Sequence, residues 1–443
     1  MAFAVLEQCK VEQAPMDVFT LHDGDGVLSA GATRGTSGAN SHSFHTTTAT
    51  EAPATSTRLG SMALRPRGGD AGAPGSPSTS SAAAQSTDGT SPRPSTGPGV
   101  LSGMANLATA TARQYMDPNV IDPFKLMKPQ LKDLTESIKL LTHVDNPLLQ
   151  KVAMYFFEQP GKRFRPAIVL LVSQAGPGAE AISQKQRRLA EITEMIHTAS
   201  LMHDDVMDHA THRRGVPALN SVHGNQLAIL AGDFLLSRAS LNLARLGNLE
   251  VVELLSTVIA HLVEGEVMQS HTGGAEALNF DYYVRKTYLK TASLLAHSCK
   301  AAILLSDAQD PARREAAELA FDYGKHLGLA FQIQDDILDI VGDLETLGKE
   351  PGSDLREGIT TAPTLYALEE HAELREMIVR GFASEGDAEK ALELVRGSDG
   401  VAKSRELAKH HGALAIEAAE KMAPSDAREG LVQLARLVVE RDS

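Results

Sequence analysis

Apolar residues recur at three- and four-residue spacing along most of the chain after residue 113, which is the period of an amphipathic α-helix. Short Gly- and Pro-containing segments such as 176–178 and 350–352 separate the periodic stretches. Strand alternation bounded by hairpin turns is absent. The pattern predicts helices over 126–141, 188–202, 226–246, 250–268, 290–305, 312–341 and 404–422. We therefore expect an all-α fold, a bundle of more than eight helices around a central cavity.

The first 113 residues have a different amino-acid composition. Ser, Thr, Gly and Pro dominate them, in runs such as Ser-Pro-Ser-Thr-Ser-Ser at 76–81, and such sequence buries too little apolar area to offset its conformational entropy. We expect residues 1–113 to form a disordered, low-complexity extension and residues 114–443 to form one helical domain. The stretch 34–113 is rich in Ser and Thr and carries more Arg than acidic residues, as organelle-targeting peptides do. The extension is either such a peptide or an untargeted tail.

Composition and charge exclude several classes of protein. Only 4% of the 443 residues are aromatic and none is Trp, which argues against strand-rich and base-stacking proteins. The formal charge of −14 excludes a generally basic nucleic-acid binder. Two cysteines, Cys9 and Cys299, are too few and too far apart for a disulfide framework or a structural zinc site. No apolar stretch predicts a membrane span.

Two acidic clusters share the pattern Asp-Asp-x-x-Asp, at 204–208 and 335–339. The first and last Asp of each are four residues apart, so on a helix their carboxylates project from one face about 6 Å apart and repel each other. Apolar residues precede both clusters, which predicts buried helices that end in a polar cavity. One such cluster alone would fit a solvated acidic face. The matched pair instead predicts a site for a hard cation such as Mg²⁺.

Two compact basic groups accompany the acidic clusters. Gly161-Lys162-Arg163-Phe164-Arg165-Pro166 begins a predicted helix, and Arg213-Arg214-Gly215 follows the first acidic cluster. Either alone would fit a surface basic pair, but together in an acidic chain they indicate recognition of two phosphate-bearing groups. Neither is a Gly-rich phosphate loop, which disfavours nucleotide hydrolysis.

These motifs occur in an order that resembles the trans-polyprenyl diphosphate synthase family, over residues 117–443. Further matching segments are 194–205, 232–235, 264–266, 290–294 and 331–336. The resemblance implies an isoprenyl diphosphate synthase helical bundle that condenses isopentenyl diphosphate with an allylic diphosphate. Magnesium ions and basic side chains would neutralise the leaving diphosphate, and a dry cavity would protect the allylic cation.

The resemblance also assigns roles to individual residues. Those implied to bind isopentenyl diphosphate are Lys162, Arg165, His197 and Arg214. Those implied to hold the allylic diphosphate are Arg213, Lys290 and Lys349. The implied principal Mg²⁺ ligands are Asp204, Asp208 and Asp335, with Asp205, Asp336 and Asp339 in supporting roles. Thr291 and Gln332 are implied to place oxygen dipoles near the reacting allylic carbon.

Two positions near these motifs depart from a simple match to the family. Lys286-Thr287 duplicates the Lys290-Thr291 pair, but Ala-Ser-Leu follows only the second copy, so we set the first aside. Ile359 stands where many relatives have a second Lys after the second acidic cluster, which leaves Lys349 as the expected lysine on that side.

The length of the product can be argued from Ala199 and Ser200, the residues five and four positions before Asp204. A growing chain would run along this helix, where a bulky aromatic residue would block it and two small residues leave a tunnel open. We predict a product of about six to ten isoprene units for a ubiquinone or plastoquinone side chain. The alternatives are a geranylgeranyl or farnesyl diphosphate synthase, a class I terpene cyclase, and a non-catalytic subunit of a heteromeric prenyltransferase.

The resemblance extends to partners and compartment. It implies a homodimer, with a heteromer as the alternative, no nucleic-acid partner, and peripheral membrane contact for product release. The expected location is the mitochondrion, with the plastid or cytoplasm as alternatives.

Overall fold

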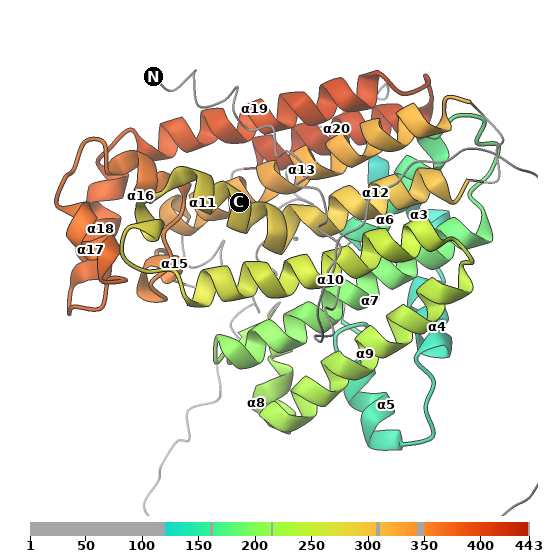
Figure 1. Ribbon diagram of the computed structural model, residues 1–443, viewed down its shortest axis with the longest axis horizontal. Helices are drawn as coiled ribbons and strands as arrows, with labels where there is room; N and C mark the ends of the chain where they lie inside the picture. The colour runs from blue at the N-terminus through green and yellow to red at the C-terminus, as the bar shows by residue number, and fades with distance from the viewer. Residues whose placement is uncertain (1–119, 160–162, 214–215, 307–310, 343–349, 442–443) are drawn as a thin grey trace, which may run out of the picture. The chain divides into compact units, whose positions relative to one another are not determined.

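The computed structural model describes residues 120–159, 163–213, 216–306, 311–342 and 350–441 (Figure 1). These residues belong to one unit, Ser91–Ser443. They are mostly helical, which confirms the predicted all-α fold class. The expected extension 1–113 and its boundary lie outside the described residues.

The elements of the first half of the domain are α3 (Pro123–Leu131), α4 (Leu134–Leu141), α5 (Pro147–Met154), α6 (Phe164–Ala175), α7 (Gln184–Met207), β1 (His212–Arg213), β2 (Val216–Pro217), α8 (Leu219–His223), α9 (Asn225–Arg245) and α10 (Leu249–Ser270). Those of the second half are η1 (Glu276–Leu278), α11 (Phe280–Thr287), η2 (Tyr288–Ala292), α12 (Ser293–Leu304), α13 (Arg313–Val341), α15 (Ser353–Arg356), α16 (Ala362–Ala367), α17 (Leu374–Val379), α18 (Asp387–Arg396), α19 (Gly400–Glu420) and α20 (Asp426–Glu440). η1 is a 3₁₀ turn and η2 is a π-helical turn.

The structure differs from the predicted elements in several places, including the short helices α15–α18, which were not predicted. The stretch 126–141 is two helices, α3 and α4, separated at residues 132–133. A short antiparallel pair, β1 with β2, was not predicted, since two-residue strands leave no alternation to detect.

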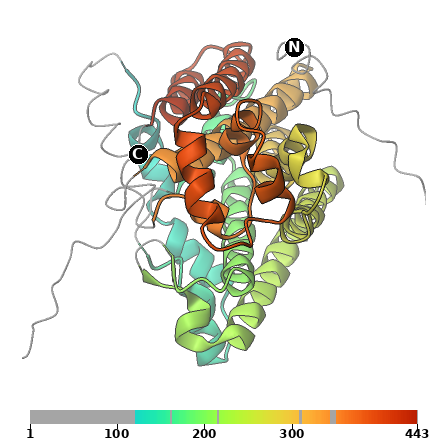
Figure 2. The ribbon, with the colours of Figure 1, turned by 90° about the vertical axis from the view of Figure 1, so that its left-hand side faces the viewer.

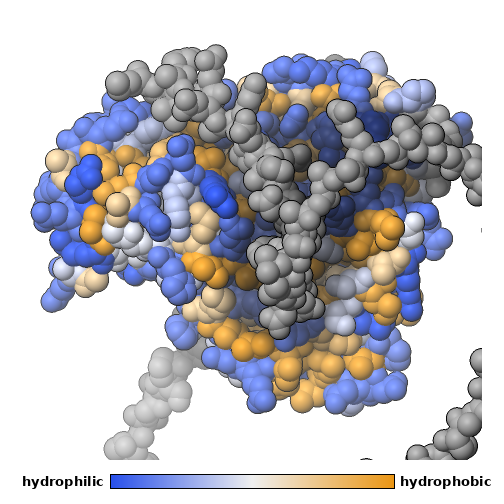
Figure 3. Space-filling view, viewed as in Figure 1, coloured by the Kyte–Doolittle hydropathy of each residue, from blue (hydrophilic) through white to orange (hydrophobic). Residues whose placement is uncertain are grey.

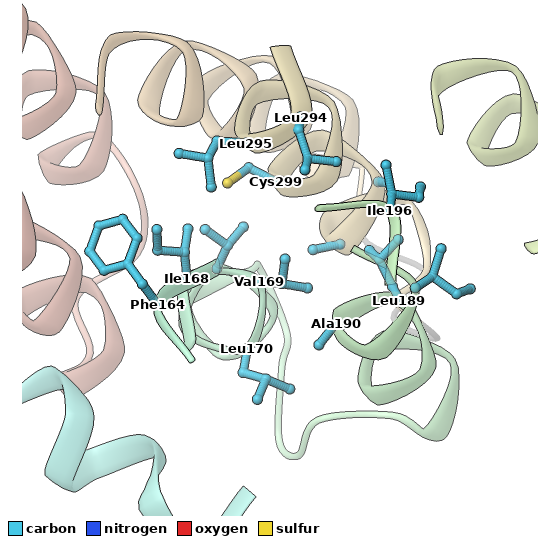
Figure 4. Packing of buried hydrophobic residues seen from close by; sticks show 14 of the residues in the cluster. Phe164, Ile168, Val169, Leu170, Leu189, Ala190, Ile196, Leu294, Leu295 and Cys299 are labelled. Carbon is cyan, nitrogen blue, oxygen red and sulfur yellow. The ribbon is translucent and has the colours of Figure 1, made fainter. Parts of the chain in front are cut away.

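The centre of the domain is α6, which is apolar on almost every side. Ten of its twelve residues are buried, the sequence signature of a helix surrounded by others. Its neighbours are α3, α7, α12 and α20. Figure 4 shows Ile168 and Val169 of α6 beside Cys299 of α12, with Leu189 of α7 at the other side of the same layer. α6 therefore joins the first basic motif, at its own start, to α7, which carries the first acidic cluster.

A second, smaller core lies among the short helices. Leu355, Ile378 and Val395 belong to it, together with Ile340 near the end of α13. In Figure 2 the helices α15–α18, orange to red, face the viewer as one group. This group covers the end of α13 that bears the second acidic cluster.

Helix α9 is long and apolar enough to cross a membrane, the one such helix in the described part of the chain. The sequence analysis did not expect a span. Helices of a protein core meet the same criterion, and α9 packs along α7. Apolar side chains nevertheless remain exposed on it and on α10, namely Leu230, Leu241, Val263 and Val267. Figure 3 shows apolar surface in the lower part of the view, where α9 lies in Figure 1.

Close packing of α13 on the π-turn η2 depends on Gly328. A methyl group there would lie 2.5 Å from Ala292 Cα, closer than carbon atoms approach. We expect Gly328→Ala to lower the free energy of unfolding by about 1–3 kcal/mol, because the strain outweighs the better helix propensity of Ala. Thermal or urea denaturation would measure it. Gly273→Ala, whose added methyl meets nothing within 4 Å, should change stability by less than about 0.5 kcal/mol. Equal stability of the two variants would contradict the packing argument.

Candidate active site

Helix α7 carries the first acidic cluster to the middle of the molecule. Ser183 begins the helix with a capping box formed with Gln186, and the buried middle of α7 keeps it straight to its end at Asp208. Asp205 is fully buried and pairs with Arg213 on β1. Asp204 is half-buried and Asp208 is exposed. Two of the three carboxylates are thus open toward solvent, and the third is engaged by protein.

Helix α13 divides its acidic cluster in a similar way. Asp336 is buried and accepts hydrogen bonds from the Tyr283 hydroxyl at 2.6 Å and from the Gln332 amide at 2.9 Å. Asp339 is buried too, and accepts from the Ser353 hydroxyl at 2.9 Å.

Asp335, the first residue of that cluster, is half-buried and pairs with Arg441 at the end of α20.

Burial changes the acidity of these groups. It raises the pKa of Asp204 to about 7, an effect that Lys290 opposes and the nearby Glu266 reinforces. The pKa of Asp208 is raised as well, because neighbouring protein atoms remove part of the water around its carboxyl although the residue is exposed. Asp336 also has a raised pKa because it is buried, although its hydrogen bonds to Tyr283 and Gln332 favour the charged form. Charged carboxylates at these positions are therefore stabilised by a compensating cation.

The donor set fits a hard divalent ion. Asp204, Asp208 and Asp335 offer carboxylate oxygens that are not fully buried, the ligand type that Mg²⁺ prefers. Among the described residues, no three His, Cys, Asp or Glu side chains converge closely enough to hold an ion by themselves. Ions at this site would therefore share their coordination sphere with water and substrate oxygens.

Lys290 and Thr291 lie in the π-turn η2, between α11 and α12. Such turns are frequent at functional sites. Gly265 lets α10 approach this turn, because a methyl group there would lie 2.9 Å from the Lys290 backbone nitrogen. Lys290 Nζ lies 2.6 Å from Glu266 Oε2 on α10. The Thr291 hydroxyl donates to Gln332 Oε1 at 2.8 Å, so the two predicted oxygen dipoles are in contact.

Two arginines of the first basic group contact side chains of α7. Arg163 adopts a left-handed conformation (φ 52°) just before α6, and its guanidinium pairs with the buried Glu194 of α7. Arg165 then lies beside His197, with Nη1 and Nε2 2.8 Å apart. These two predicted ligands of isopentenyl diphosphate are brought together. The other predicted basic residues, Lys162, Arg214 and Lys349, lie outside the described residues.

The two predicted chain-length residues lie on α7, one turn before Asp204. Ala199 is fully buried among core residues. Ser200 is half-buried, and its hydroxyl donates to the His197 carbonyl at 3.0 Å.

Two residues of this site, Tyr283 and Arg441, were missed by the sequence analysis. Tyr283 bonds to Asp336 from α11 and belongs to no recognised pattern. Glu266 lies in the matching segment 264–266 but was given no role in binding or catalysis, and it pairs with Lys290. Arg441 is 2% exposed, and its guanidinium lies 4.3 Å from the Phe331 ring centre. The only sequence signal for it was a basic residue after the last amphipathic helix.

Comparison with known proteins identifies the family of the chain. The family described as "Polyprenyl synthetase" matches residues 146–395. A prenyl transferase of Synechocystis is 49% identical over 72% of this chain and 97% of its own. The mitochondrial solanesyl-diphosphate synthase 1 of rice is 43% identical over 72% of this chain and 79% of its own.

Solved structures extend the agreement to the fold. A polyprenyl synthase from Caulobacter crescentus, complexed with calcium and isoprenyl diphosphate, superposes with a TM-score of 0.66 at 31% identity. The match covers 78% of this chain and all of that one. With both acidic clusters at the ends of buried helices, the chain is a prenyltransferase and belongs to the polyprenyl synthetase family.

Proposed function

We propose that the protein condenses isopentenyl diphosphate with an allylic diphosphate and repeats the step to make a long all-trans-polyprenyl diphosphate for a quinone side chain. The observation that carries this proposal is the position of η2 beside both acidic clusters. Lys290 acts on Asp204, and Thr291 bonds to Gln332, which donates to Asp336. The similarity to the rice solanesyl-diphosphate synthase supports the long product.

In this proposal Mg²⁺ is held by Asp204, Asp208 and Asp335. The supporting residues are Asp205, Asp336 and Asp339, whose carboxylates form hydrogen bonds and ion pairs with other protein side chains. Bound Mg²⁺ would supply the positive charge that makes diphosphate a good leaving group. The calcium in the Caulobacter structure supports a divalent cation in this family. Lys290 and Arg213 add positive charge of the protein's own near the same carboxylates.

The remaining residues act on the reacting carbon atoms. Cleavage of the allylic C–O bond sends the electron pair to diphosphate and leaves an allylic cation. The double bond of isopentenyl diphosphate attacks this cation, and the product then gives a proton to the released diphosphate. The Thr291 hydroxyl donates its hydrogen bond to Gln332. Its oxygen lone pairs therefore remain available to stabilise the allylic cation. Arg165 and His197 bind the isopentenyl diphosphate.

The wider organisation is also part of the proposal. Residues 114–443 would be the catalytic domain and residues 1–113 an extension for organelle targeting, with the mitochondrion favoured by the name of the rice relative. The exposed apolar side chains of α9 and α10 support a homodimer formed through these two helices.

A product assay tests the proposed reaction. Purified protein incubated with Mg²⁺, isopentenyl diphosphate and farnesyl diphosphate should release diphosphate and form a polyprenyl diphosphate of about six to ten units. Chromatography of the dephosphorylated products measures this length. A cyclic hydrocarbon would instead indicate a terpene cyclase, and inertness until a second protein is added would indicate a non-catalytic subunit.

Cation binding should depend on pH through Asp204. Its pKa of about 7 means that the carboxyl is mainly protonated below pH 7 and must lose its proton to bind Mg²⁺. We expect the affinity for Mg²⁺ to fall about tenfold per unit as pH decreases below 7. Calorimetry in two buffers of different ionisation enthalpy should detect proton release on binding. Asp204→Asn should weaken binding and reduce that release, and identical release in the variant would contradict the assignment.

Product length should respond to Ala199. Its side chain is fully buried beside the proposed path, so Ala199→Phe should place a ring in the tunnel and shorten the main product to fewer than about six units. Ala199→Ser adds only one atom and serves as the control. Circular dichroism would establish that both variants fold. A folded Ala199→Phe enzyme with an unchanged product distribution would contradict the tunnel assignment.

A further inference from the structure

Lys286 is a buried lysine without an obvious partner. It lies on α11, four residues before Lys290, and is 8% exposed. Its Nζ is 5.9 Å from the centre of the Tyr283 ring. Among the described residues, no carboxylate lies within ion-pair distance of it. The sequence analysis set this residue aside as a duplicate, but its burial shows that it is not an ordinary surface lysine.

The surroundings of Lys286 compensate its charge only in part. Burial lowers its pKa, while Asp336 and Asp354 raise it from a distance. The Asp336 carboxylate already accepts from Tyr283 and Gln332, one bond on each oxygen. A largely buried ammonium group with no contacting anion is costly. An anion bound in the adjoining pocket would reduce this cost.

A small pocket lies next to Lys286. Thr360 and Ile359 line it, together with Tyr283. The Thr360 hydroxyl is buried and has no hydrogen-bond partner, and the residue is 8% exposed, like Lys286. Two hydrogen-bond donors without partners thus border one pocket. Its acidic residue, Glu276, is exposed to solvent, so water screens its repulsion of an anion.

The pocket adjoins the second acidic cluster. Tyr283 lines the pocket, and its hydroxyl donates a hydrogen bond to Asp336. The Tyr283 side chain therefore lies between the pocket and the second acidic cluster. A diphosphate held through cations at this cluster would have an oxygen-rich end close to the pocket. We propose that Lys286 and Thr360 form a subsite for one phosphate group of the allylic diphosphate, or of the diphosphate released from it. This inference rests on the function proposed above.

Ile359 offers a test of the subsite, because a positive charge can be introduced at this position to replace that of Lys286. It lines the same pocket from the loop after α15, yet its side chain carries no charge. Lys286 reaches the pocket from α11 and supplies the positive charge in its place. A lysine introduced at position 359 should therefore replace the charge lost when Lys286 is mutated.

Calorimetric titration with inorganic pyrophosphate in the presence of Mg²⁺ tests the subsite on the full chain. Lys286→Met should weaken pyrophosphate binding about tenfold to a hundredfold, the effect of one charged hydrogen bond. Thr360→Val, which removes only the hydroxyl, should weaken it about fivefold. The double variant Lys286→Met with Ile359→Lys should recover most of the affinity. Lys421→Met removes one exposed lysine from α19's end and should leave binding unchanged.

Steady-state kinetics show which of the two substrates depends on Lys286. Lys286→Met should raise the KM for farnesyl diphosphate much more than the KM for isopentenyl diphosphate. Unchanged pyrophosphate binding in a folded Lys286→Met variant would overturn the subsite, as would equal loss for both substrates without recovery by Ile359→Lys. If Lys286→Met does not fold, Thr360→Val decides, and unchanged binding there overturns the proposal. A wild-type enzyme that binds pyrophosphate but elongates nothing would refute the proposed function alone.

Discussion

The removal of carboxylates from water is the constraint on which the rest of this structure depends. The six aspartates of the two clusters lie near the ends of α7 and α13, helices that are buried for other reasons. Each must be neutralised by a proton, a hydrogen-bond donor or a cation. The positions of several other elements follow from how the protein meets this requirement.

Four of the six are engaged by the protein itself. Asp205 pairs with Arg213, Asp335 with Arg441, Asp336 with Tyr283 and Gln332, and Asp339 with the start of α15. These contacts hold β1, α11, the end of α20 and the small core of α15–α18 against the acidic ends of the long helices. Asp204 and Asp208 keep a raised pKa, so positive charge from outside the fold has a defined place to act.

Much of the fold and of the site could be predicted because the signals are local. Helical periodicity located α7, α9, α10 and α13, and the spacing within Asp-Asp-x-x-Asp placed two carboxylates on one face of each acidic helix. Contacts between distant segments have no such signal: Arg441 reaches Asp335 across 106 residues, and Tyr283 reaches Asp336 across 53. The short helices α15–α18 escaped prediction because fewer than three turns rarely show a period.

The π-turn at Tyr288–Ala292 joins two helical segments whose rotations are set independently. The hydrogen bond from Tyr283 to Asp336 orients α11, whereas the burial of Leu295 and Cys299 orients α12. A π-turn holds one more residue than an α-turn, so a single-residue deletion there would restore a regular α-helix, whereas a deletion within α11 or α12 would rotate one part of the helix against the other by about 100°. The turn is therefore the one place between residues 283 and 299 where the length of the chain can change without displacing the side chains on either side.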